Sequence, residues 1–366
     1  MGVGEADTQH VQINRRGAAA NILLDRPATL NALTTAMRAE IGSAFPGFAR
    51  DPMVYAALLK SSSPRAFSVG GDIREISSWA RENPQEARRS LAEEYALNWL
   101  LECFSKPTIS LIDGLVMGSG VGVSIYGTHR VAGESYVFAM PETSIGLFPD
   151  DGLAWTFARL PQRTGIYLGL TGRRIGRADA FRLGLATHCI PAARFAEIED
   201  ALAEADPVDP VLDSRHEDPG LGELDARREL IDTHFAASSV EEIIASLTSA
   251  ACKGGEAADW CQGVLADLKF RSPTSLKVTL RHIREAKARD LRQTLVIDYR
   301  LACRFIEGRD FHEGVRAAVI DKDRAPRWQP DRLEDVSEAM VDRYFAPMPG
   351  EELVLPTRQE MQSARV

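Results

Sequence analysis

Short apolar runs alternate with longer helix-like segments along roughly the first half of the chain. Residues 18–25, 54–60 and 107–112 are apolar runs closed by polar residues, a pattern typical of buried strands. Between the first two runs, apolar residues recur every three or four positions over residues 29–45. This spacing predicts a helix with one apolar face that stops at Pro46. The alternation of strands and helices favours an α/β (α+β) core.

The composition of the chain and the spacing of its apolar residues change near Ala205. Residues 206–220 are rich in proline and acidic side chains, which predicts an exposed connector. Beyond it the spacing is mostly helical, and Ser272 followed by Pro273 has the residue types of a helix N-terminus. We therefore divide the chain into a core (10–205), an acidic connector (206–225), a helical lobe (226–330) and a polar, partly loose C-terminal tail (331–366).

Length and charge narrow the class of protein. The 366 residues suffice for two domains, or for one domain with a lobe, and the net charge of −9 lacks the basic footprint of a nucleic-acid binder. Residues 108–127 are apolar but contain Asp113 and five glycines, so they predict buried core and no membrane span. The first ten residues have no apolar signal-peptide core, and we expect a cytoplasmic enzyme or binding protein.

Three segments contain residue choices that point to chemistry. In the first, Gly70 and Gly71 precede Asp72 where an expected strand meets an expected helix. Adjacent glycines free main-chain N–H groups to point at a ligand, and a helix N-terminus adds a positive dipole. The alternative is a plain strand–turn–helix connection with Asp72 as the N-cap.

The second segment places small residues where another strand should end and a helix begin: Gly118, Ser119, Gly120 and Gly122. It matches neither a phosphate-binding P-loop nor a dinucleotide fingerprint. One interpretation is close helix packing through small residues. The other is a main-chain N–H donor at Ser119 that converges with that of Gly71 to form an oxyanion hole, which stabilises charge on a carbonyl oxygen.

The third segment sets carboxylates in the otherwise apolar residues 138–155. Glu142, Asp150 and Asp151 lie there among aromatic and aliphatic side chains. A carboxylate buried in such surroundings has a raised pKa, in the range useful for acid–base catalysis. The alternative is that these acids cap turns at loop edges. We favour this second interpretation for Asp151, while the sequence leaves both open for Glu142 and Asp150.

Other kinds of catalytic centre have no signal in the sequence. The seven histidines show no paired spacing of metal ligands, and the five cysteines are scattered as expected for reduced thiols. No GxSxG elbow is present. We therefore expect neither a metal site nor a serine hydrolase of the α/β-hydrolase type.

Four motifs follow one another along the chain: DRPATLNAL, AFSVGGDIRE, KPTISLIDGLVMGSG and PETSIGLFPD. In this order and spacing they resemble the crotonase (enoyl-CoA hydratase/isomerase) superfamily. EEYALN, SPTSLKVTLR and DFHEGVRAAVIDKDRAPRW are similar to the branch that hydrolyses 3-hydroxyisobutyryl-CoA, and the resemblance covers residues 10–345. It implies a crotonase-like spiral of ββα repeats, a helical C-terminal region and a possible homo-oligomer.

The resemblance also implies roles for individual residues. Gly71 and Ser119 would supply the two N–H donors of the oxyanion hole, and Glu142 and Asp150 would be the catalytic carboxylates. Glu142 would either attack the thioester or activate water, and Asp150 would bind the substrate hydroxyl or assist proton transfer. The further implied contacts are Glu94 and Asp72 to the substrate, and Arg26, Arg65 and Arg74 to the CoA phosphates.

Gly122 separates two possible reactions in this comparison, because hydratases of the superfamily carry a second catalytic glutamate at that position. The resemblance therefore implies hydrolysis of 3-hydroxyisobutyryl-CoA or a similar short 3-hydroxyacyl-CoA, as in valine catabolism. CoA is part of the substrate, and no further cofactor is expected. A crotonase-fold hydratase or isomerase and a catalytically silent CoA-binding protein are the alternatives. Ser119 replaces a glycine usual in the family and adds a side chain to the pocket, and Asp151 replaces an apolar residue and adds charge beside Asp150. Leu153 and Ala154 replace small glycines, which implies a narrower or reshaped acyl pocket.

Overall fold

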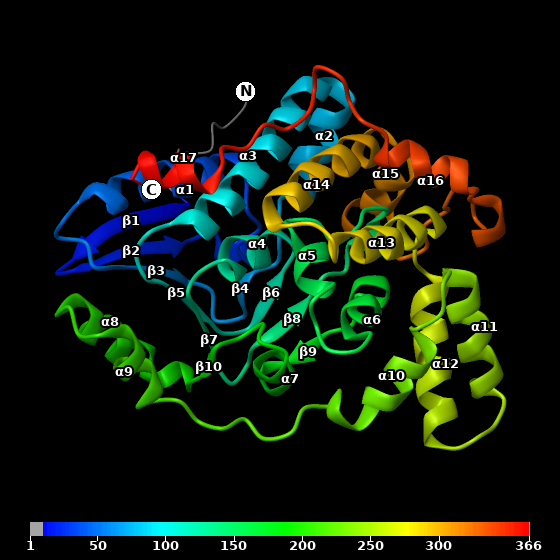
Figure 1. Ribbon diagram of the computed structural model, residues 1–366, viewed down its shortest axis with the longest axis horizontal. Coiled ribbons are helices and arrows are strands. Elements are labelled where there is room, and N and C mark those ends of the chain that lie inside the picture. Colours follow the sequence, from blue (N-terminus) through cyan, green and yellow to red (C-terminus); the bar gives the residue numbers. More distant parts are fainter. Residues whose placement is uncertain (1–9, 366) are drawn as a thin grey trace.

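The structure, a computed structural model that describes residues 10–365, is built on two sheets (Figure 1). Within these residues, six strands form the larger sheet, in the order β1-β2-β3-β5-β7-β10, and four form the smaller, in the order β4-β6-β8-β9. Neighbours are parallel except in the β1–β2 and β8–β9 pairs. The strands are β1 (Val11–Arg16), β2 (Ala19–Leu24), β3 (Ala56–Ser61), β4 (Ala66–Ser68), β5 (Thr108–Ile112), β6 (Leu115–Met117), β7 (His129–Ala132), β8 (Val137–Ala139), β9 (Ile175–Gly176) and β10 (His188–Cys189).

Successive strand pairs supply one strand to each sheet. β3, β5 and β7 lie in the larger sheet, and the strands that follow them, β4, β6 and β8, lie side by side in the smaller one. A helix or helical turn follows each pair, so the chain winds as a spiral of ββα repeats. The predicted α/β (α+β) architecture is confirmed. Parallel strands such as β5 are buried on both faces, which is why they read as continuous apolar runs.

Helices surround the sheets and form most of the C-terminal half (Figure 1). Those of the first half are α1 (Thr35–Arg50), α2 (Ile73–Glu82), α3 (Pro84–Cys103), α4 (Ser119–Ile125), α5 (Leu153–Phe157), α6 (Thr164–Thr171) and α7 (Arg177–Arg182). They are followed by α8 (Phe195–Ala203), α9 (Val208–Asp213), α10 (Arg228–His234), α11 (Val240–Ala251), α12 (Glu256–Lys269), α13 (Pro273–Ala286), α14 (Leu291–Glu307), α15 (Arg309–Val315), α16 (Glu338–Phe345) and α17 (Arg358–Ser363). Short turns include the 3₁₀ segments η1 (Pro27–Thr29) and η2 (Glu142–Ile145) and the π-helical segment η5 (Arg316–Ile320).

The helix predicted over residues 29–45 begins and ends later than expected. α1 spans Thr35–Arg50 and continues through Pro46, so the predicted stop is wrong. Proline removes one hydrogen bond from a helix interior. Here tertiary packing compensates, because Phe45 is fully buried and its ring meets that of Phe104 edge-on at 4.8 Å between centroids.

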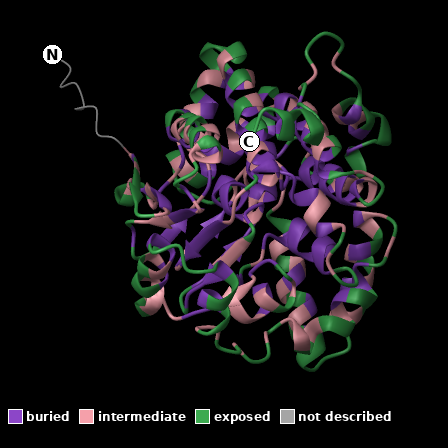
Figure 2. Ribbon diagram, turned by 60° about the vertical axis from the view of Figure 1, so that its left-hand side comes forward, coloured by how far each residue is buried: buried purple, intermediate pink, exposed green. Residues whose placement is uncertain are grey.

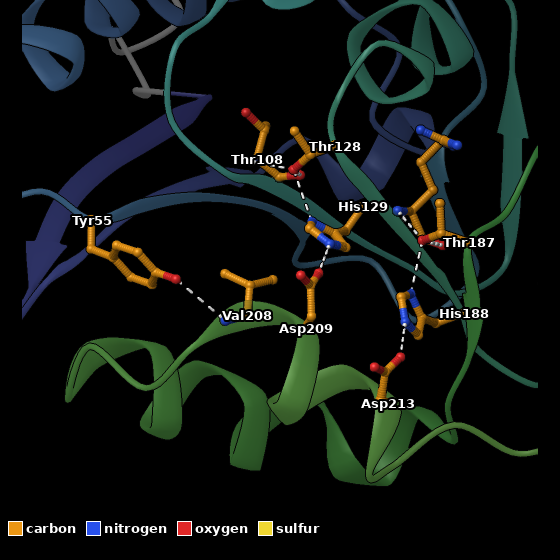
Figure 3. Close-up of polar contacts among 10 residues, drawn as sticks. Tyr55, Thr108, Thr128, His129, Thr187, His188, Val208, Asp209 and Asp213 are labelled. Atoms are coloured by element: carbon orange, nitrogen blue, oxygen red, sulfur yellow. Dashed lines mark hydrogen bonds and ion pairs between the residues drawn. The ribbon is translucent and has the colours of Figure 1, made fainter.

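The acidic connector is not simply an exposed loop, because α9 forms within it and docks against the larger sheet. His129 Nε2 lies 2.9 Å from Asp209 Oδ1, and His188 Nε2 lies 3.2 Å from Asp213 Oδ1 (Figure 3). These pairs join α9 to strands β7 and β10. Apolar side chains of α8 and α9 are buried against the same face of the sheet: Ile198, Leu202, Val208, Val211 and Leu212.

The C-terminal helices pack on the core and complete one side of it. α14 packs against α3, and α15 packs against η2 and α2. Figure 2 shows buried residues continuing from the strands into the inner faces of the helices. Among residues 10–365, no helix combines the length and the apolar character needed to cross a membrane.

The C-terminal tail is packed on the body of the protein. Trp99 Nε1 donates to the main-chain oxygen of Pro356 over 2.8 Å, and the side chains of Leu355 and Met361 are buried. The tail, for which we expected a partly loose conformation, therefore makes specific contacts with the body of the protein at these residues. The few apolar side chains of the tail pack against neighbouring helices. The polar composition of the segment gave no indication of this packing.

Candidate active site

A cavity of about 100 Å³ lies at the carboxyl ends of three parallel strands of the smaller sheet. Gly71 follows β4, Ser119 follows β6 and Glu142 follows β8. Because β4, β6 and β8 are neighbours and parallel, the segments after them converge at one edge, where ligands of α/β proteins commonly bind. The same cavity is lined by Glu94 of α3 and by Asp150, so both predicted carboxylates, both predicted N–H donors and Glu94 lie together.

The main-chain N–H groups of Gly71 and Ser119 are available to a ligand. Among residues 10–365 neither donates to a protein acceptor. The Gly71 segment is fixed by Leu33, whose N–H donates to Gly70 O and whose carbonyl accepts from Asp72 N–H, both over 2.8 Å. Ser119 begins α4, where an N–H has no partner within the helix. A side-chain carbon at Gly71 would lie 3.0 Å from Ser119 Oγ, so the two segments almost touch.

Glu142 supplies a buried carboxyl group to the cavity. Its Oε2 has no hydrogen-bond partner among residues 10–365. Burial, and after it the charge of Asp150, raises the pKa of Glu142 well above its usual value. Gly118, with φ of +46°, makes room for this group, because a side-chain carbon there would lie 3.3 Å from Glu142 Oε1. A carboxylate in such surroundings is a stronger base than one in water.

Asp150 is held by a tyrosine of α3. The Tyr95 hydroxyl donates to Asp150 Oδ2 over 2.8 Å. Desolvation is the main cause that raises the pKa of Asp150, followed by the charges of Glu94 and Asp298, while the Tyr95 hydrogen bond lowers it. Two carboxyl groups with raised pKa therefore face one small cavity, an arrangement suited to acid–base or nucleophilic work.

The hydroxyl of Ser119 is tied to Glu94. Ser119 Oγ donates to Glu94 Oε1, and Glu94 Oε2 lies 3.7 Å from Nη2 of Arg38. Arg38 is itself buried and donates to the main-chain oxygen of Leu33 over 3.0 Å. The Ser119 side chain thus has a buried hydrogen-bond partner and forms part of the cavity wall.

Gly122 and Asp151 lie against each other outside the cavity lining. A side-chain carbon at Gly122 would lie 2.7 Å from Asp151 Cγ and 2.8 Å from Asn98 Nδ2, so a larger residue does not fit without rearrangement. Asp151 is fully buried, and neither carboxylate oxygen has a hydrogen-bond partner among residues 10–365. Burial, then the charges of Asp150 and Glu94, raises the pKa of Asp151. The interpretation of Asp151 as an acid at a loop edge is therefore wrong, because its side chain is fully buried. Its φ of +54° is nevertheless typical of a turn.

Asp151→Asn is expected to stabilise the protein, by about 1–3 kcal/mol near pH 8, because it removes a buried carboxylate without partners. Asparagine also tolerates the left-handed backbone at this position. A folded-state pKa above the unfolded value near 3.9 means that this group favours folding at low pH, a contribution lost as the pH rises through the folded pKa. The gain should therefore be larger near pH 8 than near pH 5, as measured by chemical denaturation.

Asp298 offers a matched control for this prediction. It is also fully buried, but its Oδ2 accepts the Gly152 N–H over 2.6 Å and its Oδ1 pairs with Nε2 of His282. Asp298→Asn should therefore lower the free energy of unfolding. A loss of stability in Asp151→Asn at both pH values would contradict the assignment of Asp151 as an unpaired buried acid.

A larger groove adjoins the cavity and shares Val69, Gly71 and Ile73 with it. Three cations line the groove: Arg26, Arg74 and Lys322. Arg26 is partly neutralised, because its Nη1 lies 2.8 Å from Asp72 Oδ2. Two of the predicted site residues, Asp72 and Arg65, do not line the smaller cavity that holds Glu142. Asp72 lines this groove, where it caps α2. Arg65 is exposed and lines neither the groove nor the cavity.

Sequence reasoning did not find Arg38, Tyr95 or Lys322. Tyr95 directly follows Glu94 in the motif EEYALN, and this position is the local signal that could have indicated it. Arg38 has no such signal, because only the packing of α1 beside α3 brings it to the cavity. No group of three His, Cys, Asp or Glu side chains suited to a metal ion is found in the part of the chain that the structure describes.

Solved structures and curated relatives identify the class of protein that this fold and site define. A carnitinyl-CoA dehydratase from Mycobacterium thermoresistibile superposes with a TM-score of 0.88 at 34% identity, covering 95% of this chain and 99% of that one. An enoyl-CoA hydratase from Rhodobacter sphaeroides gives 0.87 at 36% identity, covering 95% and 100%. Both of these proteins are named as enzymes of CoA thioesters.

The sequence comparisons are more specific. The profile of the enoyl-CoA hydratase/isomerase family matches residues 19–345. 3-Hydroxyisobutyryl-CoA hydrolase 1 of Arabidopsis thaliana is 38% identical, covering 99% of this chain and 98% of its own. The chain belongs to the enoyl-CoA hydratase/isomerase family, and within it to the group of enzymes named 3-hydroxyisobutyryl-CoA hydrolases.

Proposed function

We propose that the protein hydrolyses the thioester of 3-hydroxyisobutyryl-CoA or of a similar short 3-hydroxyacyl-CoA, a reaction of the valine-catabolism type. The observation that carries the proposal is one small cavity that holds Glu142, Asp150 and the N–H groups of Gly71 and Ser119, which donate to no acceptor among residues 10–365. The absence of a side chain at Gly122, whose place is taken by the Asp151 carboxyl, disfavours hydration through a pair of glutamates. The similarity to named hydrolases over nearly the whole chain supports the same reaction.

The proposed reaction begins with the thioester carbonyl oxygen between the N–H groups of Gly71 and Ser119. Negative charge grows on that oxygen as the carbonyl carbon is attacked, and each donor of such a pair contributes about 2.7–4 kcal/mol to stabilising it. In one route Glu142 attacks, the C–S bond breaks to release CoA, and water then cleaves the resulting anhydride. In the other, Glu142 removes a proton from water, and the hydroxide displaces CoA directly.

The size of the cavity supports a short acyl group. A cavity of about 150 Å³ holds a benzene molecule, so the space of about 100 Å³ here suits an acyl chain of a few carbon atoms. A substrate hydroxyl on that chain would meet Asp150 or Glu94, which both line the cavity. Site carboxylates that accept a hydrogen bond from a substrate discriminate strongly against analogues without the hydroxyl. In the adjoining groove, Arg26, Arg74 and Lys322 are the cations that would meet the CoA phosphates.

A panel of acyl-CoA thioesters tests the proposal. The purified protein should release free CoA from 3-hydroxyisobutyryl-CoA, measured with a thiol reagent, with kcat/KM at least about tenfold above that for isobutyryl-CoA and far above that for octanoyl-CoA. No release of CoA from 3-hydroxyisobutyryl-CoA would overturn it. Loss of the enoyl absorbance of crotonyl-CoA without CoA release would indicate a hydratase, and calorimetric CoA binding without any turnover would indicate a silent binding protein.

A further inference from the structure

Tyr95 is a buried residue in contact with the site whose role the proposed reaction leaves unassigned. Its side chain is fully buried within the main apolar cluster. The hydroxyl nevertheless reaches Asp150 Oδ2, to which it donates over 2.8 Å. A ring fixed by close packing is a rigid donor, because the hydrogen bond needs no further ordering of the side chain.

We infer that Tyr95 is a positioning residue for Asp150: its hydroxyl fixes the carboxylate at the edge of the acyl cavity and favours the ionised form during turnover. With Oδ2 held by Tyr95, Oδ1 is the oxygen left to accept a hydrogen bond from the substrate. The inference deepens the proposed hydrolase function and rests on it.

The surroundings of Asp150 explain why such a donor matters. The groups that face it from the packed elements are acids: Glu94 on α3, Asp298 on α14, Glu142 on η2 and the adjacent Asp151. Arg38, which lines the same cavity, lies beside Glu94, and Nε2 of His282 is hydrogen-bonded to Asp298 Oδ1. Among residues 10–365, Tyr95 is the one side chain that donates a hydrogen bond to this carboxylate. A hydrogen bond to the charged form opposes the desolvation and repulsion that favour protonation.

One turn of α3 therefore supports two sides of the cavity. Glu94 accepts from Ser119 Oγ, beside the oxyanion donors, and the next residue, Tyr95, donates to Asp150. α3 is held in turn by its packing against α1, α2 and α14. Two consecutive residues of the motif EEYALN thus contact the cavity lining: Glu94 accepts a hydrogen bond from Ser119, and Tyr95 donates one to Asp150.

Tyr95→Phe tests the inference, because it removes the hydroxyl and leaves the ring. We expect kcat/KM for 3-hydroxyisobutyryl-CoA to fall about tenfold. The pH–rate profile of the wild type should contain a limb that is absent from the profile of Asp150→Asn. In Tyr95→Phe the midpoint of this limb should rise by about one pH unit. Tyr126→Phe is the matched control, because the Tyr126 hydroxyl is also buried but donates to the main-chain carbonyl of Asp151 on the same loop. That variant should leave the limb in place.

Two further measurements separate positioning from a merely structural role. On the Asp150→Asn background, Tyr95→Phe should change kcat/KM by less than about twofold, since the carboxylate it serves is gone. The ionisation of Asp150 can also be followed without substrate, from the carboxylate infrared difference between wild type and Asp150→Asn, and its midpoint should rise in Tyr95→Phe. The inference would be overturned if Tyr95→Phe moved neither the limb of the pH–rate profile nor the infrared midpoint. It would also be overturned if Tyr95→Phe lowered kcat/KM as much on the Asp150→Asn background as in the wild type. If the wild type hydrolyses no acyl-CoA, the proposed function fails, while the infrared titration still decides the role of Tyr95.

Discussion

Glu142→Gln is expected to lower kcat for 3-hydroxyisobutyryl-CoA hydrolysis by at least about 10³-fold. Both routes of the proposed reaction use the Glu142 carboxylate, either as the nucleophile or as the base for water, and an amide does neither. The loss should appear in kcat more than in KM, because the carboxylate acts on the reacting atoms. Steady-state release of CoA with a thiol reagent measures it.

The pH dependence of the wild type gives an independent check on Glu142. Burial and the neighbouring Asp150 hold the pKa of Glu142 well above its usual range, so its ionised form becomes available only as the pH rises. kcat/KM should therefore rise with pH through that shifted pKa, at a pH above the usual carboxyl range.

The glutamine variant should be folded, since it has nearly the same shape and no hydrogen bond to Oε2 is lost among residues 10–365. Its circular dichroism and thermal midpoint are the controls. Retention of more than about a tenth of wild-type kcat by a folded Glu142→Gln would refute the catalytic assignment.

Ser119→Pro is expected to lower kcat by about 10²–10³-fold, because it deletes one of the two N–H donors of the oxyanion hole. Ser119 is the first residue of α4, the position at which a helix tolerates proline best, since the N–H there has no partner within the helix. The substitution therefore acts on the donor with little effect on the helix. Single-turnover kinetics with 3-hydroxyisobutyryl-CoA report the chemical step directly.

Proline also removes the hydroxyl that donates to Glu94, so Ser119→Ala is the necessary control. Alanine keeps the N–H and loses only the hydroxyl, and it should reduce kcat by less than about tenfold. The difference between the two variants isolates the N–H group. Equal effects of Pro and Ala would show that the hydroxyl, and not the main-chain donor, carries the function of Ser119.

The sequence located the parts of the site that lie within single motifs. Gly71, Ser119, Glu142 and Asp150 each stand in a short segment with an unusual pattern, a glycine turn after a strand or an acid in an apolar run. The structure brings all four to one cavity. It does not bring Arg65 there, because proximity to a motif along the chain does not determine which way an exposed loop residue faces.

Residues that reach the site from distant elements could not be found in this way. Arg38 lies on α1, which was itself predicted with the wrong ends, since the pattern gave no sign that Pro46 would be held inside a helix. Asp151 adjoins Asp150, yet it points away from the cavity into the space beside Gly122. A left-handed turn at Asp151 separates the two side chains, and a local pattern of residue types does not encode that conformation.

The sequence by itself determined the strand–helix alternation, the glycine turns and the acids that this family uses. These are local properties, set by hydrophobic periodicity and by the backbone freedom of glycine. Only the tertiary structure decided that Tyr95 holds Asp150, that Ser119 is tied to Glu94, and that the tail and the acidic connector pack on the body of the protein. The physical reason is that a buried polar group must find its partner in three dimensions, across a separation in sequence that no periodicity reports.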